Sequence, residues 1–229
     1  MRIDGAANFR DLGGYLTRTG AMVAWGRVFR SDSLDHLTGD DVVRLDDLGL
    51  QTVIDLRLPT GDPPRSAPRA RRHVLPIVDP AVGDPAFTPG VDLADIYAHA
   101  LRTRAGVLCR ALELVADAPQ PLVFHCSAGR DWAGLLAAVL LGALGVADSD
   151  IADDYALTQT VLDGLLAPVR LSLADQGIAL APEVHTADAA TMRRLLRRLE
   201  AEHGSVLGWA LDHGTDPVVV GLLRDRLLV

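Results

Sequence analysis

The sequence predicts an α/β fold in which a central, mainly parallel sheet is flanked by helices. Two short segments rich in apolar and β-branched residues, 51–57 and 121–126, are bounded by turn residues, as buried strands are. Segments with helical periodicity alternate with them, and this order favours a parallel sheet. A chain of 229 residues has the length of one domain. We therefore expect a single domain over residues 1–229, in which 148–203 forms an appended helical lobe.

The first part of the chain contains a predicted strand and a predicted helix. Segment 26–34 is interpreted as a short strand that leads to a polar Ser-Asp-Ser sequence. Segment 38–49 is interpreted as a helix, because Thr38 suits the N-cap and a glycine follows the last turn. Segment 59–89 is dense in proline, which predicts a loop, and 73–78 is its one strand-like part.

The rest of the chain is mostly helical by periodicity. Segment 121–126 is a predicted buried strand, and the apolar run 133–146 after it is a predicted buried helix. Further helices are predicted over 92–116, 148–174, 186–203 and 216–228.

Composition restricts the classes of partner. The chain is 49% hydrophobic and 23% charged, which supports a sizeable core. A net charge of −8 argues against nucleic acid or an anionic membrane as the main partner. A local basic pocket for a small-molecule or phosphorylated substrate remains compatible with that charge.

The cysteines, the apolar runs and the histidine spacing bear on the location of the protein and on its cofactors. Cys109 and Cys126 are too few for a disulfide framework and suit a reducing cytosol. The N-terminal residues form no apolar run of the signal-peptide kind, and 133–146 is too short for a membrane span. The histidines at 185, 203 and 213 lack metal-ligand spacing. We expect a cytoplasmic protein with no membrane span, no metal and no cofactor.

The stretch "VFHCSAGRDWAG", residues 123–134, carries the predicted chemistry. A strand, a loop of small residues and an apolar helix direct backbone N–H groups and a helix N-terminus at an anion. Cys126 stands at the end of the strand, so we predict a depressed thiol pKa and a nucleophilic thiolate. His125 would support the loop, while an inert buried cysteine is the structural alternative. Departure of the leaving group needs a general acid, for which Asp131 and Asp32 are the candidates.

Several blocks of the sequence resemble one family in order. "NFRDLGGY" (8–15), "VFRSDSL" (28–34), "VIDLR" (53–57) and "HCSAGRD" (125–131) are similar to successive blocks of the atypical bacterial protein tyrosine phosphatases. This cysteine-dependent group resembles the mycobacterial secreted lipid and tyrosine phosphatases. "DDYALT" (153–158) and the segment 192–214 resemble its C-terminal helical blocks. The resemblance implies a cysteine-phosphatase-type fold and hydrolysis of a phosphate monoester, such as phosphotyrosine, phosphoserine or a phosphoinositide-like substrate.

The resemblance also implies roles for the loop residues. In the family the loop typically reads His-Cys, two variable residues, Gly, Lys or Arg, Asp, Arg, Thr, Gly. At the matching positions Cys126 is the nucleophile, Arg130 the basic residue at the rim and Asp131 the acid. The predicted phosphate- or substrate-binding residues are Ser127, Ala128, Gly129, Arg130, Trp132, Ala133 and Gly134, with Arg10 and Arg57 as further cations.

Two positions depart from the family pattern. Trp132 stands where the phosphate-gripping arginine belongs, and Ala133 stands where a hydroxyl usually assists the leaving thiolate. Tryptophan offers one N–H and no charge, so it cannot replace a bidentate guanidinium. Loss of one such electrostatic contact costs about a hundredfold to a thousandfold in rate.

Three interpretations remain open at this point. The first is a weak or altered phosphatase in which Arg130, Arg10 or Arg57 partly replaces the lost charge. For Arg10 and Arg57, surface or sheet-edge ion pairs are the structural alternative. The second is a catalytically dead module that binds phosphorylated or other anionic ligands. The third is a repurposed enzyme, for example of a biosynthetic pathway, in which Trp132 lines the pocket for a more apolar substrate and Cys126 or Asp131 acts on a non-phosphate bond. An engineered substitution at position 132 would give the same sequence.

Overall fold

The computed structural model describes residues 1–59, 67–78, 92–174 and 185–229 of the chain. Most of the predicted proline-rich loop and most of the predicted linker 175–185 therefore lie outside the described residues.

A five-stranded sheet forms the centre of the protein, in the order β1-β2-β5-β3-β4. Its strands are β1 (Arg10–Asp11), β2 (Val28–Ser31), β3 (Thr52–Asp55), β4 (Arg71–Val74) and β5 (Leu122–His125). Strands β2, β5, β3 and β4 run parallel, and only β1, at one edge, pairs antiparallel with its neighbour. The predicted α/β class and the mainly parallel sheet are confirmed.

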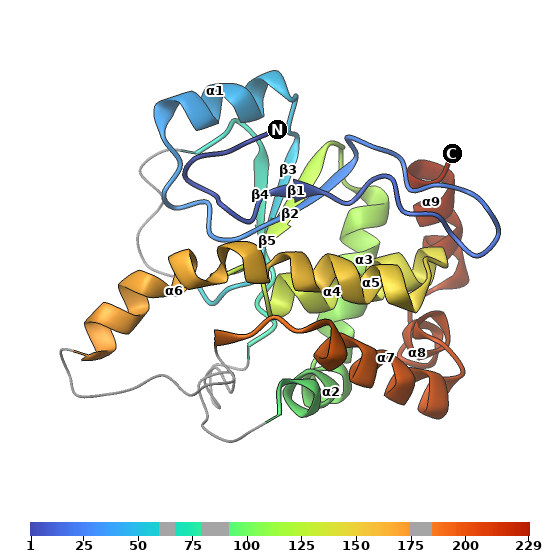
Figure 1. Ribbon diagram of the computed structural model, residues 1–229. Helices are drawn as coiled ribbons and strands as arrows, with labels where there is room; N and C mark the ends of the chain where they lie inside the picture. The colour runs from blue at the N-terminus through green and yellow to red at the C-terminus, as the bar shows by residue number, and fades with distance from the viewer. Residues whose placement is uncertain (60–66, 79–91, 175–184) are drawn as a thin grey trace.

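Helices cover both faces of the sheet (Figure 1). They are α1 (Gly39–Asp47), α2 (Leu93–Thr103), α3 (Ala105–Asp117), α4 (Trp132–Leu144), α5 (Asp148–Leu157), α6 (Gln159–Ala174), α7 (Ala189–His203), α8 (Val206–Asp212) and α9 (Pro217–Leu227). Helix α1 lies on one side of the sheet, and α2, α3, α4, α7, α8 and α9 lie on the other.

The strand sequences divide the core into two layers. Successive strand residues point to opposite faces of a sheet. On β3, Val53 belongs to the smaller core beneath α1, whereas Ile54 belongs to the larger core on the helical side. On β5, Val123 and Phe124 divide in the same way. The buried strands predicted over 51–57 and 121–126 are therefore confirmed.

Helix α4 is the central helix of the larger layer. All thirteen of its residues are buried, as expected for a helix that is apolar on every side. It packs against α5 and α8, and it ends at Gly145, whose φ of +91° is the left-handed conformation that favours glycine. Because α4 follows β5 after a short loop, its N-terminus lies at the carboxyl edge of the sheet.

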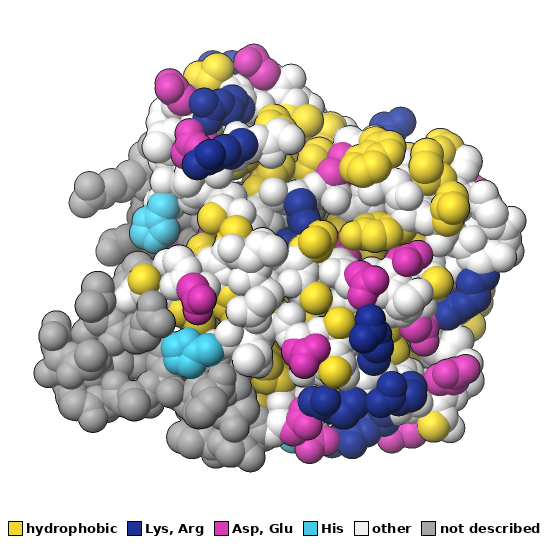
Figure 2. Space-filling view, in the orientation of Figure 1, with side chains coloured by type: hydrophobic (Ala, Val, Ile, Leu, Met, Phe, Trp, Pro, Cys, Tyr) yellow, Lys and Arg dark blue, Asp and Glu magenta, His cyan; other side chains and the backbone are white. Residues whose placement is uncertain are grey.

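Exposed ion pairs connect α7 to its neighbours. Arg193 pairs with Asp153 of α5 at 2.9 Å, and Arg198 pairs with Asp95 of α2 at 3.0 Å. Figure 2 shows blue and magenta side chains interspersed over this part of the surface. Exposed pairs of this kind contribute little to stability, and most of the packing energy comes from the buried apolar face of α7.

Several element boundaries differ from those predicted. Thr38 is confirmed as the N-cap of α1, where its hydroxyl accepts from the N–H of Asp41 at 3.1 Å. The strand predicted over 73–78 is wrong in position, since β4 ends at Val74. The single helix predicted over 92–116 is two helices, because Arg104 leaves the helical conformation with a φ of −119°. Helix α8 lies in the segment 192–214, whose helical character was implied by the family resemblance and not by periodicity. No helix in the described part of the chain is long and apolar enough to cross a membrane.

Candidate active site

Cys126 lies where the carboxyl end of β5 meets the N-terminal end of α4. Its side chain is buried, with 3% of the residue exposed. The backbone N–H groups of Gly129 and Ala133 are directed at its sulfur. The N-cap residue, Asp131, makes no side-chain cap hydrogen bond, which leaves first-turn amides available for other acceptors. The loop therefore directs backbone donors at the thiol, as an anion-binding loop does.

The predicted depression of the thiol pKa is wrong for this structure. Burial raises the pKa of Cys126 to about 11, and the negative charge of Asp131 acts in the same direction. The amides of Ala133 and Gly129 and the charge of Arg30 oppose this rise without cancelling it. At neutral pH the free protein therefore holds Cys126 mainly as a thiol.

The loop conformation depends on Gly129. Its φ is +68°, a conformation that favours glycine. A Cβ at this position would lie 2.6 Å from Nδ2 of Asn8 and 2.6 Å from the carbonyl oxygen of Ser31. No other residue type fits there without movement of the loop or of the strand beside it.

Cys126 opens on a cavity of about 500 Å³. Eight of the predicted site residues line it, namely Asp32, Arg57, Cys126, Ser127, Ala128, Arg130, Asp131 and Trp132. Other lining residues come from the N-terminal segment, from the segment 33–36 after β2, and from α6, and they include Ala7, Ser33, His36, Leu165 and Leu166. The predicted residues His125, Gly129, Ala133 and Gly134 are not on the described wall of this cavity.

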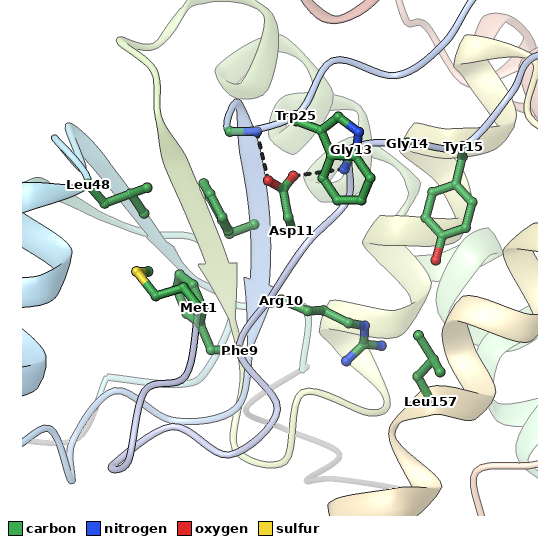
Figure 3. Close-up of a pocket in the computed structure, with 12 residues that line it drawn as sticks. Met1, Phe9, Arg10, Asp11, Gly13, Gly14, Tyr15, Trp25, Leu48 and Leu157 are labelled. Carbon is green, nitrogen blue, oxygen red and sulfur yellow. Dashed lines mark hydrogen bonds between the residues drawn. The ribbon is translucent and has the colours of Figure 1, made fainter.

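Arg10 is not brought to this cavity. It lies in a separate pocket of about 620 Å³ beside the edge strand β1, together with Asp11, Tyr15 and Trp25 (Figure 3). Its Nε donates to Asp154 at 2.9 Å. Burial lowers the pKa of Arg10 to about 10, so the guanidinium stays charged at neutral pH.

The two arginines on the cavity wall are already engaged with carboxylates. Arg57 pairs with Asp55 at 2.9 Å and also with Asp35. Arg130 donates from Nε to Asp131 at 2.9 Å and from Nη1 to the carbonyl of Thr186 at 3.3 Å. Each guanidinium is thus balanced by a carboxylate instead of being directed at an incoming anion.

His125 is a neutral supporting residue. Burial lowers the pKa of His125 to about 4. Its Nε2 lies 3.6 Å from Asp55, and its Nδ1 lies 3.4 Å from the carbonyl of Cys126.

The two candidate acids have different surroundings. Asp32 accepts from the N–H of Asn8 at 2.9 Å, and burial raises the pKa of this carboxyl above its usual value. Asp131 accepts from the hydroxyl of Tyr97 at 2.6 Å and from Arg130 through both of its oxygens. Asp32 therefore has the environment that favours the protonated form.

Trp132 is the first residue of α4 and part of the cavity wall. It is 4% exposed, and its indole N–H is buried with no partner among the described residues. It brings an aromatic surface to the cavity wall beside Cys126.

Sequence reasoning missed three residues near the loop, namely Asn8, Arg30 and Asp154. Arg30 is fully buried, pairs with Asp154 and donates to the carbonyl of Gly129. The side chain of Asn8 donates to the carbonyl of Ala128 at 2.9 Å. All three lie in the blocks that carry the family resemblance, but their contacts are long-range and leave no local pattern.

Among the described residues, no three His, Cys, Asp or Glu side chains gather as a metal site requires.

Comparison with known proteins agrees with this geometry. The model of the tyrosine phosphatase family matches residues 1–229. The chain is 29% identical over 230 residues to a candidate tyrosine-protein phosphatase of Cupriavidus necator, with 93% of this chain and 83% of the relative covered. It is 28% identical over 275 residues to the triple specificity protein phosphatase PtpB of Mycobacterium tuberculosis, with 99% and 98% covered.

Two solved structures are also similar. TpbA of P. aeruginosa, in complex with phosphotyrosine, matches at 17% identity and a TM-score of 0.39, over 86% of this chain and 91% of that one. The core catalytic domain of the PP-IP phosphatase SIW14 from S. cerevisiae matches at 16% identity and a TM-score of 0.38, over 76% and 96%.

The family match spans every residue of the printed sequence, and the cysteine loop lies where parallel strand β5 meets helix α4. This chain therefore belongs to the tyrosine phosphatase family and is a phosphatase-type hydrolase.

Proposed function

We propose that the protein is a slow cysteine-dependent phosphatase that hydrolyses aryl phosphate monoesters. One observation carries the proposal: Cys126 lines a cavity of about 500 Å³, and the N–H groups of Gly129 and Ala133 are directed at its sulfur. The same amides suit the oxygens of a phosphoryl group, because a helix N-terminus and oriented amides favour negative charge.

The proposed reaction has two steps. The thiolate of Cys126 attacks phosphorus, an S–P bond forms, the P–O bond to the leaving group breaks, and an acid protonates the departing oxygen. Water then attacks the phosphocysteine, releases inorganic phosphate and returns the sulfur. We assign the acid to Asp32, because it lines the cavity and burial raises the pKa of its carboxyl. Asp131 holds Arg130 in this scheme.

The reaction is slow for two physical reasons. Position 132 supplies no cation for the charge that develops on the phosphoryl oxygens, and Arg57 and Arg130 are balanced by carboxylates. The thiol pKa of about 11 also leaves little thiolate at neutral pH.

The cavity wall favours an aromatic ester. Trp132 of α4 and two leucines of α6, Leu165 and Leu166, line the same cavity as Cys126. An aromatic ring beside an indole gains from stacked or edge-to-face contact. A phosphotyrosine-like group, with its phosphate at the loop and its ring against Trp132, fits this division of the cavity.

Cys126→Ser should abolish hydrolysis of p-nitrophenyl phosphate, because serine at this position is a far weaker nucleophile. Cys109→Ser is the matched control, since Cys109 is buried in α3 against the carbonyl of His213 and should leave the rate unchanged. The release of p-nitrophenol measures both. A wild-type protein that binds tungstate without turnover would replace the proposal with the binding-module interpretation.

The rate with p-nitrophenyl phosphate should rise about tenfold per pH unit between pH 7 and 9, because the thiolate fraction rises until the thiol pKa is reached. Phenyl phosphate, with a poorer leaving group, should give a flat profile. With phenyl phosphate, the thiolate fraction of Cys126 rises with pH while the protonated fraction of Asp32 falls, and the two effects on the rate offset each other.

The Asp32→Asn variant separates these two effects. It should make the phenyl phosphate profile as steep as that of p-nitrophenyl phosphate, at a lower rate. A rate with p-nitrophenyl phosphate that is already constant below pH 7 would contradict the raised thiol pKa, and an unchanged profile in Asp32→Asn would remove Asp32 as the acid.

Trp132→Arg should raise kcat/KM for p-nitrophenyl phosphate by about a hundredfold or more, because a guanidinium at this position restores the missing grip on the phosphoryl oxygens. Trp132→Phe is the control for loss of the indole and should stay near the wild-type rate. Both are assayed below their measured Tm. An equal effect of the two substitutions would show that the absent cation is not what limits the rate.

A further inference from the structure

Two successive carbonyl groups of the catalytic loop are held by side chains from elsewhere in the chain. Nδ2 of Asn8 donates to the carbonyl of Ala128 at 2.9 Å. The guanidinium of Arg30, on β2, donates to the carbonyl of Gly129. Asn8 and Arg30 are 120 and 99 residues from their partners in sequence.

Holding these carbonyls fixes the direction of the amides that follow them. In a trans peptide the C=O and the next N–H point in opposite directions. With the Ala128 carbonyl held by Asn8, the N–H of Gly129 points to the sulfur of Cys126, as observed. With the Gly129 carbonyl held by Arg30, the N–H of Arg130 points away from the Arg30 guanidinium. Successive amides turned to one side form a concavity that binds anions.

The holding side chains belong to one buried network. Asp154 of α5 accepts from Arg30 and, at 2.9 Å, from Nε of Arg10. Arg10 also donates from Nη1 to the side-chain oxygen of Asn8. This fixes the amide orientation of Asn8, because its oxygen faces Arg10 and its nitrogen faces the loop. Figure 3 shows Arg10 extending from β1 toward the helix that carries Leu157.

The loop packs closely against Asn8 and β2 at Gly129. The place of a Cβ on Gly129 is occupied by Asn8 and by β2, at 2.6 Å from each. Neither Asn8 nor Arg30 lies on the described wall of the cavity. Asn8 therefore acts on an anion only through the loop, whereas the charge of Arg30 also acts on the Cys126 thiol.

We propose that Asn8 and Arg30 are positioning residues, which turn the amides of Gly129 and Arg130 toward the anion by holding the carbonyls of Ala128 and Gly129. The identity of the anion as a phosphoryl group rests on the proposed function. The direction of the amides is independent of the proposed function, because it follows from the hydrogen bonds of Asn8 and Arg30.

Asn8→Ala tests the proposal because it removes the donor to Ala128. Tyr15→Phe is the matched control, since the Tyr15 hydroxyl donates to Asp154 at 3.3 Å and touches the same network without touching the loop. Two quantities are measured for each protein: the Kd for tungstate, a tetrahedral oxyanion, and the amide hydrogen exchange of residues 126–131. The Tm of each variant is recorded as well.

We expect Asn8→Ala to weaken tungstate binding at least tenfold and to speed exchange in 126–131, while Tyr15→Phe changes neither. Arg30→Lys is the second variant if Asn8→Ala does not fold. Lysine keeps a charge beside Asp154 but lacks the second guanidinium nitrogen that donates to the Gly129 carbonyl. We therefore expect weaker tungstate binding and faster exchange in this variant as well.

Three results would decide against the proposal or limit it. Unchanged affinity and exchange in Asn8→Ala overturn it, and so do equal losses in Asn8→Ala and Tyr15→Phe, which would indicate general loosening. If the wild-type protein binds no tungstate, the proposed function fails. Faster loop exchange in Asn8→Ala alone then still supports positioning, and unchanged exchange overturns it.

Discussion

The buried ion pair between Arg30 and Asp154 connects the parts of this structure on which the site depends. Arg30 belongs to β2, Asp154 to α5, and Arg30 also holds the carbonyl of Gly129 in the cysteine loop. Burial of two charges is costly unless they are paired and hydrogen-bonded, and removal of one leaves the other uncompensated. Arg10 supplies a further partner to Asp154. The position of α5, the edge strand β1 and the loop are therefore coupled through one carboxylate.

The proposed phosphate-binding loop offers backbone amides to an anion but no arginine at position 132. Backbone amides reach the sulfur of Cys126, but position 132 holds an indole, and the arginines on the cavity wall are balanced by aspartates. The same absence of a nearby unbalanced cation explains the raised thiol pKa, since burial then dominates. In the proposed reaction, slow turnover and a poorly ionised nucleophile thus have a common origin.

Local patterns in the sequence were sufficient to predict the α/β fold and the place of the cysteine loop between a buried strand and a buried helix. The short β-branched run 51–57, bounded by turn residues, predicted a buried strand, and Thr38 predicted the start of α1. The thiol pKa could not be predicted, because it depends on how deeply the folded chain buries Cys126. Arg10 was expected near the phosphate, but its partner Asp154 is 144 residues away in sequence, and no local signal indicates that pairing. The break between α2 and α3 at Arg104 was likewise invisible to periodicity.

The central claim is that Cys126 attacks phosphorus, and a trapped intermediate tests it most directly. The wild-type protein is mixed with p-nitrophenyl phosphate at pH 9, quenched in acid and digested, and the peptides are analysed by mass spectrometry. We predict an added HPO₃ unit on the peptide that contains Cys126, and no adduct in Cys126→Ser. Turnover without this adduct, at a rate that Cys126→Ser retains, would contradict the claim.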